Sequence, residues 1–557
     1  MTIMPSKNRL TVTRQARRFA IVALFICLAA LSIFAQRRER LVDSWKPLHY
    51  DVDLKFNDQL TQIEAQTDIS VEVLAQTLTN VDLDFGDMPI DSVLVSGTAT
   101  KFERTPELLN VMLETAAKRG DKLKITVNYH GRPKDGLIFA KDGDGKMSAT
   151  GDNWPNRVHY WIPTLDHPSA KATVTFTISA SVNYEVVANG KFITVFATAG
   201  TSTWKFEEGK PIPPYCMVVA VSQGAKLDTT FEAVPLSYYV PQKDHDYASK
   251  GFSPAAPALA FFSQTVAPYP YEKLALIIGA TQFGGMENSS AIVFPGNLFN
   301  ARGNERMSTR FDVPKRLEEV VAHEIAHQWF GDSVTESTWA DLWLSEGFAT
   351  YFAGLFVEKY DGQDAFREYM RNAAQRYFNY EKQTKTPIHD EATPNLMRLL
   401  NANNYEKGAW VLHMLRSQLG DEAFFKGLRD YYKAHASANA STEDLRSALE
   451  KSSGKNLKEF FARWVYGTGH PVYELSQGSA EYAGAGEFLT ITLKQTQPGE
   501  PFLDPVPIEI DNGSSKQQVV IWPKGNTATT RVSTKGSKAA TVRLDPDETL
   551  LKEIVKQ

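Results

Sequence analysis

Residues 323–331 read HEIAHQWFG and residues 339–351 read WADLWLSEGFATY, and both stretches lie in segments with the 3.6-residue apolar period of a helix. Histidines four positions apart face the same side of a helix, so the imidazoles of His323 and His327 can reach one metal ion. The second stretch is apolar on almost every side, which predicts a buried helix. Taken alone, the first stretch also fits a polar helix face that carries two hydrogen-bonded histidines.

Glu346, in the middle of the second stretch, decides between these two interpretations. A carboxylate in a buried helix needs a partner, and a zinc ion that also binds His323 and His327 supplies one. Two histidines and one glutamate leave a coordination position open, which is typical of a catalytic zinc site. We therefore predict one Zn²⁺ per chain, bound by these three residues.

Glu324 lies next to the first predicted ligand and is the candidate general base. Zinc in such a site lowers the pKa of a bound water toward about 7 and polarises a scissile carbonyl. Glu324 can then take a proton from the water and pass it to the leaving amine, while a separate donor stabilises the oxyanion. The residue types thus predict metal-assisted hydrolysis.

Outward from this centre, the pattern of the chain changes twice. Short alternating stretches with high β propensity occupy about residues 46–234, helical patterns dominate after residue 241, and alternation returns at about residue 471. A chain of 557 residues is expected to form two to four domains. We predict a multidomain α+β protein in which an antiparallel β domain, a mainly helical domain and a small C-terminal β-sandwich pack together. Helices are expected at 313–330, 342–360, 364–378, 404–419, 421–434, 442–452 and 457–465.

The N-terminus has the pattern of an export signal. Basic residues precede an uncharged apolar run at 19–35, and the small residue Ala35 ends it. The run is also close to the roughly 17–25 residues of a membrane helix, so an uncleaved membrane anchor is the alternative. Both interpretations place the remainder outside the cytosol, in the periplasm or secreted, or anchored to the inner membrane by residues 19–35.

The composition limits which partners the chain can bind and which residue types can ligate a metal. The formal net charge is −5, which argues against nucleic acid as a partner and leaves peptide or small substrates open. Only Cys27 and Cys216 are present, and Cys27 lies in the export signal. The exported part therefore has one thiol and no internal disulfide, so its metal site must use histidines and carboxylates.

Several motifs, in their order and spacing along the chain, resemble those of the aminopeptidase N family of gluzincin zinc metallopeptidases, which includes leukotriene hydrolase. The stretches 323–331 and 339–351 resemble the family's zinc helix and third-ligand helix. Residues 284–288, GGMEN, resemble its exopeptidase motif GxMEN, and residues 405–408, YEKG, resemble the YxKG motif that carries the catalytic tyrosine. Residues 166–171 resemble a segment at the end of the family's N-terminal β domain. The resemblance spans roughly residues 48–551.

The resemblance implies a zinc aminopeptidase that acts on peptides with a free N-terminus. It implies domains at 41–235 (N-terminal β domain), 236–470 (thermolysin-like zinc peptidase domain) and 471–557 (C-terminal β domain), after a signal or anchor at 1–35. Tyr405 would stabilise the oxyanion. The substrate-binding residues would be Gly284, Gly285, Met286, Glu287 and Asn288.

The GGMEN motif also has a physical interpretation. Its glycines allow a substrate backbone to approach closely, and Glu287 offers a carboxylate to the α-ammonium of a peptide. When this carboxylate holds the α-ammonium, the carbonyl of the first residue would lie at the metal, so only one residue would be released. Phe283 is expected to line the pocket for the first side chain, and residues near Asn153 are expected to approach the amine pocket.

The sequence departs from the family pattern at Asp332, Ala340 and Ser345, where asparagines are usual. We expect these changes to alter hydrogen bonds around the ligands and not ligation itself. We also expect no long helical domain after the small β region, and so a more open site or one closed by a second subunit.

Two other enzyme functions are alternatives. An epoxide hydrolase like leukotriene hydrolase shares every motif, and a thermolysin-type endopeptidase would not need GGMEN. A scaffold of the same fold that has lost its metal would lack some of the ligand residues. The five matching residues are all present here: His323, Glu324, His327, Glu346 and Tyr405.

Overall fold

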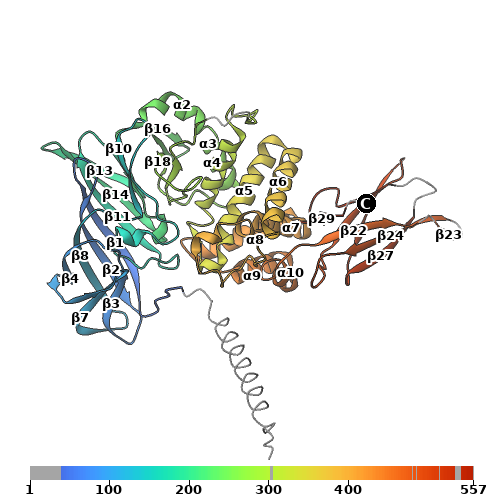
Figure 1. Cartoon of the computed structure of the whole chain (residues 1–557), viewed down its shortest axis with the longest axis horizontal. Helices are drawn as coiled ribbons and strands as arrows, with labels where there is room; N and C mark the ends of the chain where they lie inside the picture. Colours follow the sequence, from blue (N-terminus) through green and yellow to red (C-terminus); the bar gives the residue numbers. More distant parts are fainter. Residues whose placement is uncertain are drawn as a thin grey trace, which may run out of the picture.

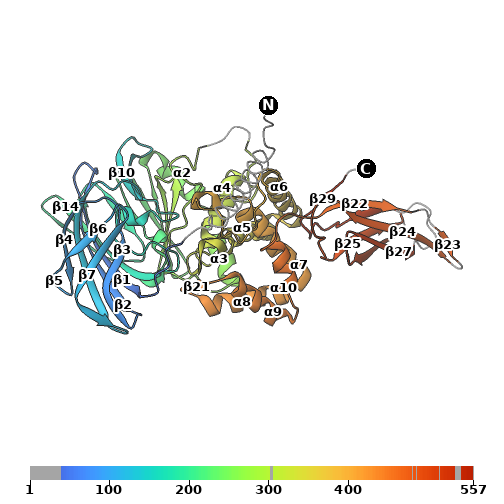
Figure 2. The ribbon, with the colours of Figure 1, turned by 60° about the horizontal axis from the view of Figure 1, so that its bottom comes forward.

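A computed structural model describes residues 39–300, 305–478, 481–483, 486–513, 515–533 and 541–555. The predicted export signal or anchor at 1–35 lies outside these residues. Three regions follow one another along the longest axis of the molecule: β-sheets, then helices, then a second group of strands (Figures 1 and 2). None of the described helices combines the length and apolarity that crossing a membrane requires.

The N-terminal region is built on an eight-stranded sheet in the order β13-β14-β11-β1-β2-β8-β4-β5. All neighbours are antiparallel except β1 and β11. Along β1 the buried side chains Tyr50, Val52 and Leu54 alternate with exposed charged ones, because successive side chains of a strand point to opposite faces. The strands are β1 (Trp45–Phe56), β2 (Ile63–Val73), β4 (Ile90–Val95), β5 (Thr98–Ala99), β8 (Lys122–Gly131), β11 (Ala172–Ser181), β13 (Lys191–Thr198) and β14 (Thr201–Ile212).

Two smaller sheets complete this region. One has the order β3-β7-β6 and the other β12-β15-β10-β9. Their strands are β3 (Thr77–Asp84), β6 (Phe102–Arg104), β7 (Leu108–Lys118), β9 (Leu137–Lys141), β10 (Met147–Gly151), β12 (Glu185–Ala188) and β15 (Val219–Ser222). The prediction of an N-terminal β-rich domain is confirmed.

A four-stranded sheet joins the β region to the helices. It consists of β16 (Ala225–Phe231), β17 (Val234–Val240), β18 (Leu274–Gly279) and β19 (Ala291–Pro295), with β17, β18 and β19 parallel. The boundary expected after residue 235 therefore falls inside β17. Two helices between β17 and β18, α2 (His245–Gly251) and α3 (Ala255–Thr265), have no counterpart among the predicted helices. α2 is short and α3 is apolar on most sides, so neither has a clear helical period.

The central helices lie where the apolar period predicted them. They are α4 (Lys315–His327), α5 (Trp343–Asp361), α6 (Gln363–Glu381), α7 (Gly408–Leu419), α8 (Asp421–His435), α9 (Thr442–Ser453) and α10 (Lys458–Trp464). Every residue of α5 from Trp343 to Val357 is buried, because this helix packs against α4, α6 and α7. Two short parallel strands, β20 (Val334–Glu336) and β21 (Ala438–Ala440), lie beside this bundle.

The C-terminal region has two sheets whose apolar side chains share one core. It extends away from the helices as a separate arm (Figure 1) and is joined to them by ion pairs such as Arg371–Glu548, 2.8 Å. Trp464 of α10 also packs on Phe502, with ring centroids 4.6 Å apart. The strands are β22 (Val472–Gln477), β23 (Glu481–Ala483), β24 (Gly486–Gln495), β25 (Val506–Asp511), β26 (Lys516–Ile521), β27 (Thr527–Ser533), β28 (Thr541–Leu544) and β29 (Glu553–Ile554).

Candidate metal centre and substrate pocket

Helices α4 and α5 bring the three predicted ligands together. The Nε2 atoms of His323 and His327 lie 3.1 Å apart, and each lies within 3.4 Å of Oε2 of Glu346. A tetrahedral zinc site with bonds of about 2.0–2.1 Å has ligand–ligand edges of about 3.3 Å. The three atoms therefore have the spacing of three corners of a tetrahedral zinc site.

The second nitrogen of His327 fixes how this ring faces the cluster. Its Nδ1 lies 3.2 Å from the carbonyl oxygen of Phe330 and 3.0 Å from Oγ of Ser345. A carbonyl only accepts, so Nδ1 carries a proton, and Nε2 is the nitrogen that faces the other two ligand atoms. Ser345 and Asp332, two of the positions that depart from the family pattern, thus lie around the ligands: Oδ2 of Asp332 accepts from Nε2 of Gln328 at 2.7 Å.

Charge also favours a cation at this point. Burial alone would lower the pKa of His327, but the carboxylate of Glu346 raises it to about 10. Burial would raise the pKa of Glu346, and the two imidazoles instead lower it to about 2. The cluster therefore attracts positive charge, and a divalent metal supplies this charge to all three groups at once.

Glu324 faces the glycines of the GGMEN segment. A Cβ on Gly285 would lie 2.2 Å from Oε1 of Glu324, so only glycine allows this close approach. Burial raises the pKa of Glu324 well above its usual value. Ligand atoms of Glu324, Glu287 and His327 also lie within 4.8 Å of one another, which places both carboxylates beside the three-ligand cluster.

The backbone of the GGMEN segment is held from two sides. Met286 forms two hydrogen bonds with Val293 of β19, at 2.7 and 2.9 Å. Nε2 of Gln328, at the end of α4, donates to the carbonyl oxygen of Glu287 at 2.7 Å. Glu287 itself is 6% exposed, and burial raises its pKa to about 7.

Tyr405 reaches the cluster from a third element. It lies in a π-helical turn, Asn403–Lys407, that precedes α7, and such turns are frequent at functional sites. Its ring stacks on that of His323 with centroids 6.0 Å apart and an interplanar angle of 8°. Burial raises the pKa of Tyr405 well above its usual value and the charge of Glu346 raises it further, so the phenol keeps its proton as a donor.

These side chains line one cavity of about 320 Å³. The sequence analysis predicts that residues near Asn153 approach the amine pocket. The neighbouring Trp154 lines this cavity and packs on Phe283. Asp152 accepts hydrogen bonds from Thr281 and Gln282, which lead into the GGMEN segment. The lining residues outside the predicted motifs are Trp154, Glu319, Val320, Tyr369, Arg376 and Leu400. No single one of them has a sequence signal that sets it apart from ordinary helix-surface or core residues.

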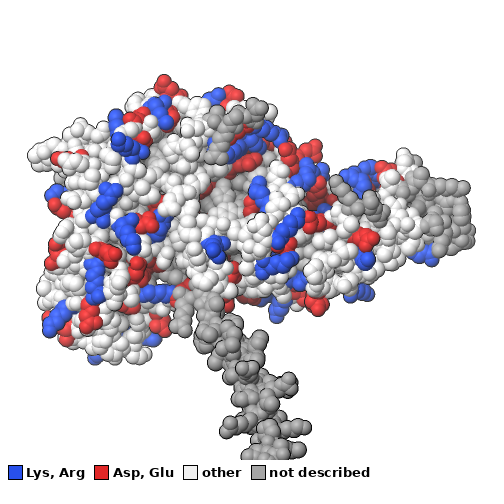
Figure 3. All heavy atoms as spheres, viewed as in Figure 1, with Lys and Arg blue, Asp and Glu red and all other residues white. Residues whose placement is uncertain are grey.

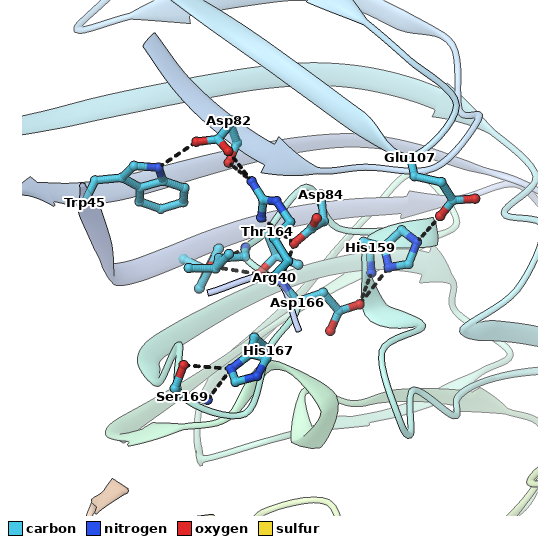
Figure 4. A network of polar contacts seen from close by, with 12 residues as sticks. Arg40, Trp45, Asp82, Asp84, Glu107, His159, Thr164, Asp166, His167 and Ser169 are labelled. Atoms are coloured by element: carbon cyan, nitrogen blue, oxygen red, sulfur yellow. Dashed lines mark hydrogen bonds and ion pairs between the residues drawn. The ribbon is translucent and has the colours of Figure 1, made fainter. Parts of the chain in front are cut away.

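Behind this wall lies a junction network, defined here as Glu39, Arg40, Asp82, Asp84, Glu107, His159, Asp166 and His167. In Figure 4, His159 lies between Asp166 and Glu107, at 2.8 and 2.9 Å, and Arg40 contacts Asp82 and Asp84. Glu39 accepts from His167 at 2.8 Å and from the backbone N–H of Trp339 at 3.2 Å. Trp339 packs on Trp154, so the network supports the pocket wall.

The outer surface shows no patch of a single charge on the face in Figure 3, where basic and acidic side chains are interspersed. A nucleic-acid-binding face would gather Lys and Arg along one element. Acidic side chains instead gather inside the cavity, where Glu287, Glu324 and Glu346 are among the lining residues.

Family comparisons match two parts of the chain. A "Peptidase M1 N-terminal domain" matches residues 46–216, and a "Peptidase family M1 domain" matches residues 252–464. The second match contains the three-ligand cluster, the GGMEN segment and Tyr405. The first contains the eight-stranded sheet and the junction network from residue 82 onward.

Curated relatives are similar over most of this chain. Aminopeptidase 2 of Candida albicans is 26% identical over 80% of this chain and 50% of its own length. The alanine/arginine aminopeptidase of Saccharomyces cerevisiae is 26% identical over 79% of this chain and 53% of its own length. Tricorn protease-interacting factor F2 of Thermoplasma acidophilum is 27% identical over 80% of this chain and 56% of its own length. The chain thus spans about half the length of the curated relatives it matches.

Proposed function

Because the chain belongs to peptidase family M1, the aminopeptidase N family, we propose that it is a zinc-dependent aminopeptidase that releases the N-terminal residue of peptides. His323, His327 and Glu346 would hold the zinc ion. Zinc, when bound, supplies an electrophile that polarises the scissile carbonyl and acidifies water. The observation that carries the proposal is the convergence of these ligand atoms beside two further carboxylates, Glu324 and Glu287.

Glu324 acts as the general base in this proposal. It does not belong to the three-ligand cluster, yet it lies beside it and against Gly285, where the scissile bond would pass. Its carboxylate takes the proton of the attacking water and delivers it to the leaving nitrogen. Tyr405 donates its hydroxyl proton in a hydrogen bond to the carbonyl oxygen as negative charge develops there.

Glu287 restricts the reaction to the first residue. Its buried carboxylate would bind the α-ammonium of a substrate whose first carbonyl lies at the metal, so that only the first residue is released. Burial raises the pKa of Glu287 to about 7, so a cationic amine that contacts it restores the charged form and gains a buried partner.

We extend the proposal to architecture and location. The helical region would be a thermolysin-like catalytic domain, and the two C-terminal sheets a β-sandwich. Residues 1–35 would direct export as a signal peptide or anchor, which places the enzyme in the periplasm or outside the cell.

A direct test compares an alanyl p-nitroanilide with its N-acetylated copy, with zinc measured on the same sample. We expect turnover of the free amine only, about one zinc per chain, and loss of turnover on chelation. Equal cleavage of both substrates would contradict the role of Glu287. A folded sample that binds no zinc and hydrolyses neither substrate would contradict the proposal as a whole.

A further inference from the structure

One side of α4 forms a wall of the cavity, and its most N-terminal polar side chain has no role in the chemistry proposed above. Glu319, Val320, His323, Glu324 and His327 all line the cavity. Glu319 precedes His323 by four residues, so the two lie on the same face one helical turn apart. Gln328, at the other end of the helix, contacts the backbone of Glu287. With a rise of 1.5 Å per residue, Glu319 and the end of α4 near Glu287 are about 12 Å apart along the helix axis.

Glu319 lacks a close cationic partner within the described chain. No hydrogen bond or ion pair joins its side chain to another described residue, whereas its neighbours are engaged elsewhere. Nζ of Lys315 contacts Glu318 at 2.7 Å, and Nε of Arg376 contacts Glu406 at 2.5 Å. Burial raises the pKa of Glu319 to about 7, as expected for a carboxylate without a direct partner.

The cavity as a whole favours cationic groups. Among the described residues that line it, the carboxylates are Glu287, Glu319, Glu324, Glu346 and Glu406, and the guanidinium is that of Arg376. Under the proposed function Glu287, beside the C-terminal end of α4, binds the α-ammonium, and Glu346 of α5 binds the metal. Glu319, nearer the N-terminal end of α4, is left for the part of the peptide beyond the cleaved bond.

The dimensions of a substrate match this spacing. Consecutive Cα atoms of a peptide are 3.8 Å apart, so the Cα of the second residue lies about 5 Å from the α-ammonium. The four-carbon stem of a lysine extends about 6 Å further. The ammonium of a fully extended lysine in second position therefore lies about 11 Å from the α-ammonium, close to the roughly 12 Å along α4 between Glu319 and the helix end that contacts Glu287.

We propose that Glu319 is a specificity determinant that selects peptides with lysine or arginine in second position, directly after the bond that is cleaved. This inference rests on the proposed aminopeptidase function. The side chain of the second residue contacts the carboxylate of Glu319, while the α-ammonium remains at Glu287. An acidic side chain in second position would instead meet an uncompensated carboxylate and bind poorly.

The test compares peptides that differ only in the second residue: Ala-Lys-Ala-Ala, Ala-Leu-Ala-Ala and Ala-Glu-Ala-Ala, each with an amidated C-terminus. Release of alanine is measured as kcat/KM for the wild type, for Glu319→Gln, for Glu319→Lys and for Glu422→Gln. The last variant removes one exposed carboxylate from the start of α8 and serves as the charge-matched control. Turnover of alanyl p-nitroanilide is measured on every sample.

We expect the wild type to favour the lysine peptide over the leucine peptide about tenfold, the ratio that 1.4 kcal/mol produces. Glu319→Gln should bring that ratio close to one, Glu319→Lys should reverse the order to favour the glutamate peptide, and Glu422→Gln should keep the wild-type order. A ratio that is the same in the wild type and in Glu319→Gln would overturn the inference. So would a wild-type preference for the glutamate peptide, which would assign the selection to Arg376. If the wild type hydrolyses neither the nitroanilide nor any peptide, the proposed function fails and not the assignment of Glu319.

Discussion

The three-ligand cluster and the junction network are both buried groups of histidines and carboxylates, but their histidines face in different ways. In the three-ligand cluster, Nε2 of His323 and Nε2 of His327 point at the same place as Oε2 of Glu346. In the junction network, the two nitrogens of His159 point in opposite directions, each to its own carboxylate. The first arrangement brings three ligand atoms to one point, as the proposed zinc site requires, whereas in the second each histidine nitrogen has its own carboxylate partner. Residue composition therefore does not distinguish the two clusters; the direction in which the histidine nitrogens face does.

A substitution at Glu324 distinguishes catalysis from metal binding in the first cluster. Glu324→Gln removes the proposed base and keeps the shape of the side chain. We expect kcat for alanyl p-nitroanilide to fall by about 10³-fold or more, with zinc content still near one per chain. Substantial residual turnover with full zinc occupancy would exclude Glu324 as the base.

One matched substitution in each cluster tests whether only the first cluster binds zinc. Glu346→Gln removes a proposed ligand, and we expect zinc content to fall well below one per chain after dialysis. Asp166→Asn removes a partner of His159 and should leave zinc content unchanged but lower the free energy of unfolding by about 3 kcal/mol. Zinc loss in Asp166→Asn, or full zinc retention in Glu346→Gln, would show that the two clusters had been assigned the wrong roles.

Glu287→Ala removes a carboxylate that lies beside the three-ligand cluster and is not a proposed ligand. Loss of a buried, charge-assisted contact to the α-ammonium should lower kcat/KM for free-amine substrates by about 10²-fold. Zinc content should not change. An unchanged rate for alanyl p-nitroanilide would rule out the recognition role of this residue.

The smallest effect concerns the charge of the completed cluster. Burial alone would lower the pKa of His159, but Asp166 and Glu107 raise it to about 9, above the unfolded value of 6.5. Its stabilising contribution is therefore fully present below pH 6.5 and is lost as the pH rises through about 9. The difference amounts to at most about 3 kcal/mol.

Chemical unfolding of the wild type and of His159→Gln between pH 6 and 10 would measure this contribution. The wild type should lose more of its unfolding free energy over this range than the variant does. Parallel pH curves for the two proteins would contradict the assignment of the charge to His159.

The sequence alone determined much of the central region. The apolar period placed α4 to α10 within a few residues of their observed bounds, because buried helix faces impose that period on the chain. The motifs at 284–288, 323–331, 339–351 and 405–408 also led to the family, which the two family matches confirm. Helices α2 and α3 escaped prediction, since a short helix and a mostly apolar one lack a distinct period.

Contacts between distant parts of the chain, which local sequence patterns do not encode, determine the remaining features of the site. Trp154, Glu319 and Arg376 belong to the pocket only because three elements far apart in sequence meet there. The π-helical turn that carries Tyr405 to the ring of His323 replaced the first turn of a predicted α-helix. Whether a histidine nitrogen offers its lone pair to a metal or donates its N–H to a carboxylate depends on which side chains the fold places opposite it. This information is not contained in the spacing of residues along the chain.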